Sequence, residues 1–147
     1  MRVVIAAVPR PLVRVVEHLL SGQEDVQIVS RSSRRDHLLT YASTLLPDLI
    51  VVNSRLMGRD VRQTIAEIKR LSPKSKVILV CPFVELSDAV RDCGADADLE
   101  EDALVGSLPP LVRRILSESQ RDASSEPTNA STFRKPDSEI RTKGTSR

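Results

Sequence analysis

The stretch PDLIVVN at residues 47–53 decides the fold of this chain. Its centre is a run of four apolar residues, three of them β-branched, between a proline-aspartate pair and an asparagine. A continuous apolar run of this length predicts a strand buried on both faces, as in a parallel sheet. Similar runs occupy residues 3–7, 26–29 and 77–80, and a weaker one, interrupted by an aspartate, occupies 97–99.

Helical patterns separate these runs. Apolar residues recur at three- and four-residue spacing between consecutive strands; they are Leu12, Val15, Val16, Leu19 and Leu20, then Leu38, Tyr41, Ala42 and Leu45, then Val61, Ile65, Ile68 and Leu71. A short helix is expected over residues 85–92. Alternating strands and helices imply right-handed crossovers, so we expect an α/β fold with a small doubly wound sheet of five parallel strands.

Two helix starts can be predicted from local chemistry. Ser32 or Ser33 is expected to cap the second helix, because serine hydroxyls accept hydrogen bonds from free N–H groups at helix starts. The last helix is expected to begin near Leu108 with Ser107 as its cap and to be short. The reason is the Pro109-Pro110 pair, since proline suits a first turn and interrupts a helix interior.

Composition excludes several function classes. The 147 residues carry a net charge of only +2, and aromatic residues make up 2%. We therefore expect no direct nucleic-acid binding, which needs a basic footprint or aromatic stacking surfaces. Cys81 and Cys93 are too few for a disulfide scaffold. Without an apolar run long enough to span a membrane or serve as a secretory signal, we expect a cytoplasmic protein with no membrane insertion.

The chain is expected to divide near residue 117. Residues 1–117 hold the strand and helix patterns, whereas residues 118–147 are rich in Ser, Thr and Pro, with Phe133 and Ile140 as their large apolar side chains. Such a segment buries too little apolar surface to offset the entropy of ordering. We expect a disordered tail, too short for a DNA-binding output domain.

An ordered set of segments runs through residues 1–116. They are Arg2-Val3-Val4-Ile5-Ala6, Pro11-Leu12-Val13-Arg14, residues 47–53 with Leu56, Gly58 and Asp60, Leu71-Ser72-Pro73 with Lys76-Val77-Ile78-Leu79-Val80, and Cys93-Gly94-Ala95-Asp96. No single segment is specific. In this order and spacing, the set resembles the receiver domain of bacterial two-component response regulators. The resemblance implies a flavodoxin-like receiver architecture.

The resemblance also implies a phosphorylation site and shows where this chain departs from it. In the family, an Asp after the third strand accepts the phosphoryl group, and two acids after the first strand help to hold Mg²⁺. A Thr or Ser after the fourth strand and a Lys after the fifth contact the phosphate. The matching positions here carry Asn53 for the acceptor, Ala7 and Val8 for the acids, Cys81 for the hydroxyl and Glu101 for the lysine.

These replacements predict a degenerate receiver, or pseudo-receiver. A neutral amide is a poor nucleophile, and Ala7 and Val8 offer no oxygen ligand for Mg²⁺. We therefore expect no catalytic residue, no metal site, no cofactor and no enzyme activity. The resemblance implies a role in two-component, or phosphorelay, signal transduction, and the replacements imply that this role is independent of phosphorylation. We expect the protein to act by contact with a histidine kinase or an output protein, and homodimer formation is left open.

Two other functions stay open. The chain could be a truncated or divergent transcriptional response regulator that lacks its DNA-binding output domain. It could also bind a small molecule in the former phosphorylation cleft. Thiol chemistry at Cys81 is less favoured, because no cationic residue is adjacent in sequence. Arg31, Arg34 and Arg35 form the most basic cluster and are interpreted as a solvated loop that enters the second helix.

Overall fold

The computed structural model describes residues 1–58, 60–82 and 93–125. It groups the chain into two compact units, Met1–Pro109 and Pro110–Arg147. The first unit contains one five-stranded sheet with the strand order β2-β1-β3-β4-β5, and every neighbouring pair is parallel. This is the doubly wound order of flavodoxin-like folds, and it confirms the predicted fold class.

The strands are β1 (Arg2–Ala6), β2 (Gln27–Ser32), β3 (Leu49–Asn53), β4 (Lys76–Cys81) and β5 (Ala97–Glu100). The central strand β3 is buried at all five positions, as its apolar run predicts. Its register places Val52 opposite Ala6 of β1 and Leu79 of β4. All three strands therefore end at the same edge of the sheet.

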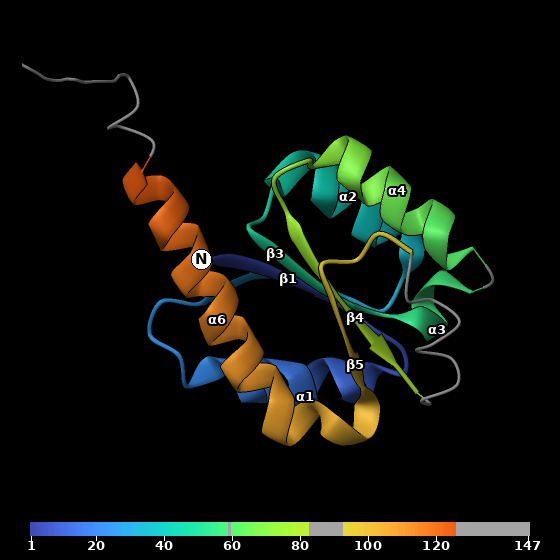
Figure 1. The fold of residues 1–147 in the computed structure, drawn as a ribbon. Coiled ribbons are helices and arrows are strands. Elements are labelled where there is room, and N and C mark those ends of the chain that lie inside the picture. Colours follow the sequence, from blue (N-terminus) through green and yellow to red (C-terminus); the bar gives the residue numbers. More distant parts are fainter. Residues whose placement is uncertain (59, 83–92, 126–147) are drawn as a thin grey trace, which may run out of the picture. The chain divides into compact units, whose positions relative to one another are not determined.

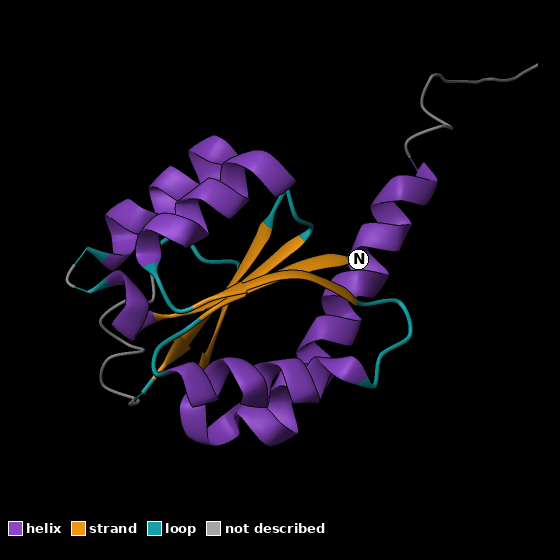
Figure 2. Ribbon diagram, turned by 180° about the vertical axis from the view of Figure 1, so that it is seen from behind, coloured by secondary structure: helices purple, strands orange, loops and turns teal. Residues whose placement is uncertain are grey.

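Helices cover both faces of the sheet (Figures 1 and 2). Helix α1 (Arg10–Ser21) packs on one face, and α2 (Arg35–Leu45) and α4 (Val61–Leu71) pack side by side on the other. Shorter elements are α3 (Ser54–Met57) and the 3-10 turn η1 (Glu101–Ala103). Helix α6 (Leu104–Ser125) follows η1.

The main core lies between the sheet and helices α2 and α4. Alternate residues along each strand point into it, and Val4, Ile50 and Leu79 are fully buried there, together with Ile65 and Ile68 of α4. The period of two follows from the pleat, which sends successive side chains to opposite faces. Fully burying each aliphatic side chain of this size contributes about 1.5–3 kcal/mol.

Two predicted helix starts are wrong. Helix α2 begins after Arg34, and no side chain caps it. The Ser32 hydroxyl instead accepts from the Arg34 N–H at 3.0 Å and so shapes the turn ahead of the helix. Helix α6 begins at Leu104 and runs through the two prolines. Leu104 and Leu108 are buried on successive turns and hold the helix ahead of the prolines, so packing outweighs the local penalty of proline.

Other sequence-based expectations concern the end of the domain, the tail and the segment 85–92. Helix α6 continues to Ser125, beyond the expected domain end at residue 117, and within the second unit Nε of Arg114 lies 3.9 Å from Oε2 of Glu118. The rest of the expected tail and the helix expected over residues 85–92 lie outside the described residues. No described helix is both long and apolar enough to cross a membrane.

Candidate functional site

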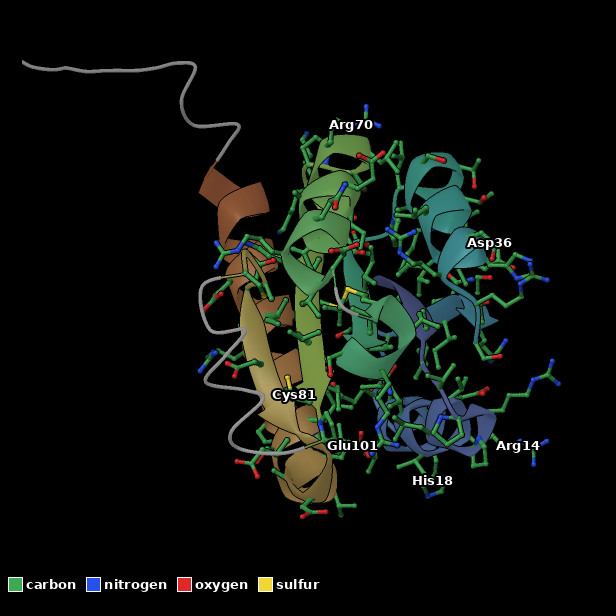
Figure 3. All side chains as sticks on the ribbon, turned by 90° about the vertical axis from the view of Figure 1, so that its right-hand side faces the viewer. Arg14, His18, Asp36, Arg70, Cys81 and Glu101 are labelled. Atoms are coloured by element: carbon green, nitrogen blue, oxygen red, sulfur yellow. The ribbon has the colours of Figure 1, made fainter. Side chains whose placement is uncertain are left out.

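The candidate site lies at the carboxyl edge of the sheet. The parallel register brings the residues that follow β1, β3 and β4 to this edge, where doubly wound folds place their ligand sites. Ala7 and Val8 follow β1, while Asn53 and Cys81 end β3 and β4. Glu101 follows β5, and Figure 3 shows it near Cys81 at one end of the sheet.

The Asn53 side chain is fully buried and is bonded to the backbone of Val8. Its Nδ2 donates to the Val8 carbonyl oxygen at 2.6 Å. Its Oδ1 accepts from the Val8 N–H at 3.2 Å and from the Leu56 N–H at 3.3 Å. The last bond makes Asn53 the N-cap of α3. We call this arrangement the Asn53 clamp.

The Asn53 clamp requires an amide. A carboxylate accepts hydrogen bonds but cannot donate one, so an ionised Asp at this position would face the Val8 carbonyl with an unmatched oxygen. The amide donates one hydrogen bond to the Val8 backbone and accepts one from it, which is the pattern that a residue of a neighbouring strand would provide. Sequence reasoning identified Asn53 as a changed position, but the clamp depends on the loop after β1, which sequence alone does not place.

Ala7 and Val8 fit the apolar interior at this edge. Ala7 is buried, and its N–H donates to the Ser32 carbonyl at 3.0 Å, which extends the pairing of β1 with β2. Val8 is half-buried and packs against the main core. Neither side chain carries an oxygen or nitrogen atom. Both positions therefore contribute packing and backbone hydrogen bonds to the site.

Cys81 is fully buried. Burial raises the pKa of its thiol to about 11, and the Asp98 carboxylate acts in the same direction. A thiol with so high a pKa stays protonated near neutral pH and is a weak nucleophile. This environment disfavours thiol chemistry, in agreement with the expectation from sequence.

Glu101 faces Arg55. The Glu101 Oε2 atom is buried and lies 3.7 Å from Nε of Arg55, which is longer than a hydrogen bond but close enough for an ion pair. Arg55 lies two residues after Asn53, so the pair joins the segment after β3 to the segment after β5. Sequence reasoning singled out Glu101 but missed Arg55. The available signal was an arginine two residues after the acceptor position, in a chain that carries an acid in place of the family's lysine.

Comparison with known proteins places this geometry in context. The chain is 28% identical over 106 residues to the response regulator protein VraR of Staphylococcus epidermidis, covering 70% of this chain and 51% of VraR. The chain is thus similar in sequence to a response regulator, of which it spans about half the length, and no family model matches it.

Solved receiver structures share the fold. The signal receiver domain of the putative response regulator NarL from Mycobacterium tuberculosis superposes with a TM-score of 0.67 at 21% identity, covering 77% of this chain and 93% of that one. A DNA-binding response regulator of the LuxR family from Staphylococcus aureus gives a TM-score of 0.67 at 16% identity, covering 78% and 97%. The receiver-like fold expected from the sequence is confirmed.

Within this receiver-like chain, the described residues contain no group of three or more His, Cys, Asp or Glu side chains placed to hold a metal ion. Oxygen ligands are what Mg²⁺ requires, and the matched positions after β1 supply none. The site as described combines a backbone clamp, an apolar loop, a protonated thiol and a pair of opposite charges.

The Arg55–Glu101 pair gives a first prediction. Glu101→Lys places two cations side by side, so the free energy of unfolding should fall by about 0.5 kcal/mol, the scale of a partly exposed pair. Urea denaturation measures the change. Glu101→Gln, which removes attraction without adding repulsion, serves as the control and should cost less. A more stable lysine variant would contradict the prediction.

Proposed function

We propose that this receiver-like chain acts in two-component signalling without conventional phosphorylation. The Asn53 clamp carries the proposal. An acyl phosphate forms when a carboxylate oxygen attacks a phosphoryl group. Here the matched side chain is an amide whose Nδ2 and Oδ1 atoms already bond to the backbone of Val8.

The surroundings of Asn53 support the same proposal. Ala7 and Val8 bring no ligand for a divalent cation, and Glu101 brings negative charge to a position where a cation would stabilise the charge on a phosphoryl group. A change at one position could be compensated by its neighbours. Here the acceptor, the metal ligands and the cation are replaced together, so we propose a pseudo-receiver with no enzyme activity.

The proposed output is protein–protein contact. A chain that cannot switch through phosphate can still present a receiver surface to a histidine kinase or to an output protein. In this proposal the Asn53 clamp and the Arg55–Glu101 pair hold the segments at the carboxyl edge of the sheet in one arrangement. The surface that a partner meets is then fixed by folding.

A phosphorylation assay tests the proposal. The protein is incubated with acetyl phosphate and Mg²⁺, and the products are separated on a Phos-tag gel beside a receiver domain known to be phosphorylated. We expect no shifted band for the wild type or for Asn53→Asp, because the metal ligands are still missing. Circular dichroism establishes that the variant is folded. A Mg²⁺-dependent shifted band from the wild type would refute the proposal.

A second candidate is a transcriptional response regulator represented by its receiver part. Two observations favour it: the chain spans 51% of VraR, and one structural neighbour is described as a DNA-binding response regulator of the LuxR family. Sequencing of the transcript distinguishes the two. A helix-turn-helix domain encoded in the same reading frame would favour the regulator, whereas a stop codon after Arg147 would favour the interaction module.

A further inference from the structure

A cavity of about 620 Å³ lies at the same carboxyl edge of the sheet as the candidate site, on the side where α1 and α2 begin. Its wall is formed by the first turns of α1, the end of β2 and the segment that leads into α2. All of these residues belong to the first unit. The volume falls in the range of small-molecule sites. We call this cavity the arginine pocket, after Arg10, Arg14, Arg31 and Arg34 in its wall.

The arginine pocket is strongly cationic. Against its four arginines stands one acidic residue, Glu17. Arg31 pairs with Glu17 at 2.7 Å, and Arg34 pairs with Asp36 at 2.9 Å. Arg10 and Arg14 form no close ion pair within the described part of the chain, and Arg14 acts on Glu17 at longer range, where with Arg31 it lowers the pKa of that carboxyl. Two cations in the wall are therefore left for a ligand.

The backbone adds to this positive charge. Arg10 and Arg34 stand at the starts of α1 and α2, where the helix dipole is positive and cations are disfavoured. Neither α1 nor α2 has a side-chain cap on its N-cap residue; α2 has Asp36 in its first turn, whereas α1 has no acidic residue there. An anion in the pocket would relieve the repulsion among the arginines and interact favourably with the uncompensated start of α1.

Two aromatic side chains also line the pocket. Tyr41, the single tyrosine of the chain, and His37 both line the pocket from α2. Their rings lie 6.1 Å apart between centroids and are inclined by 50°. The His37 Nδ1 atom lies 3.2 Å from the Ser32 hydroxyl, which holds the ring in place. Ring faces of this kind accept a planar heterocycle by stacking.

We propose that the arginine pocket binds a nucleotide. Arg10 and Arg14 bind the phosphates, and Tyr41 and His37 contact the base. Arginine suits this task because its planar guanidinium donates paired hydrogen bonds to phosphate oxygens. None of the residues that line the pocket belongs to the candidate site, and the inference is independent of the proposed function.

Calorimetric titration of the full chain with ADP tests the proposal, with inorganic pyrophosphate and adenosine as separate ligands. ADP should bind at least tenfold more tightly than either part, since it alone engages the arginines and the rings together. Its affinity should also fall as salt rises. Equal affinity for ADP and pyrophosphate would refute base recognition, and absence of ADP binding at millimolar concentration would refute the site.

Single substitutions test the contribution of the arginines and that of the aromatic rings separately. Arg14→Glu should weaken ADP binding at least tenfold, whereas Arg70→Glu makes the same charge change on α4 and should leave it unchanged. Figure 3 shows Arg14 and Arg70 far apart on the molecule. Tyr41→Leu should weaken ADP binding severalfold and leave pyrophosphate unaffected. Circular dichroism checks that each variant is folded. An equal loss of ADP affinity in Arg14→Glu and Arg70→Glu would show that binding depends only on net charge, and it would overturn the proposal.

Discussion

Replacing Asn53 by aspartate should lower the free energy of unfolding by about 3 kcal/mol at neutral pH, the scale of an unmatched buried polar group that also carries charge. The variant turns the donor that faces the Val8 carbonyl into an acceptor, where the present distance is 2.6 Å. It also places an ionised group at a fully buried position. Chemical denaturation of the two proteins at matched ionic strength measures the difference.

The deficit of Asn53→Asp should shrink as the pH falls. Burial and the Val8 carbonyl both favour the protonated carboxyl, so the pKa of this new group is raised in the folded state. A group whose folded pKa is raised gains stability as the pH drops toward its unfolded pKa, because the folded state binds the proton first. The protonated acid can donate to the carbonyl, as the amide does.

Gln63→Glu is the matched control, because it makes the same amide-to-acid change at an exposed position in the first turn of α4. An acid near a helix start is tolerated or slightly favoured, so this variant should keep wild-type stability within about 0.5 kcal/mol. If Asn53→Asp proved as stable as the wild type, the Asn53 clamp would contribute nothing to stability, and the proposed function would lose its main support.

The Cys81 thiol should react with iodoacetamide at pH 8 about a hundredfold more slowly than an unperturbed thiol. The thiolate is the reacting species, and a pKa of about 11 in place of 9.0 reduces its fraction by two powers of ten. Burial slows the reaction further. The measurement uses Cys93→Ala, so that mass spectrometry counts modification at Cys81 alone.

The same protein unfolded in guanidinium is the control for Cys81, and there the thiol should react at an ordinary rate. The raised pKa also affects stability: the contribution from Cys81 is complete below about pH 9 and declines as the pH rises toward 11, because the unfolded state loses its proton first. Rapid alkylation of the folded protein at pH 8 would show that the thiol is accessible and activated, contrary to the structure.

Sequence patterns were most informative where long apolar runs repeat. The buried β3 strand could be predicted from its continuous apolar run, and the helices α1, α2 and α4 from their helical spacing and a proline or glycine soon after each end. The predicted start of α6 failed because Pro109 and Pro110 were weighed as local signals. These prolines do not indicate that Leu104 and Leu108 are buried, because that burial depends on packing against the rest of the first unit.

The sequence by itself determined the doubly wound α/β fold and the identities of the residues at the carboxyl edge of the sheet, because periodicity and residue type are local properties. Tertiary structure alone decided what those residues do. It brought Asn53 to the backbone of Val8, Glu101 to Arg55, and Arg10 and Arg14 into one wall with Tyr41. Each contact joins segments distant in sequence, and the chain path that closes those distances is set by packing of the whole sheet.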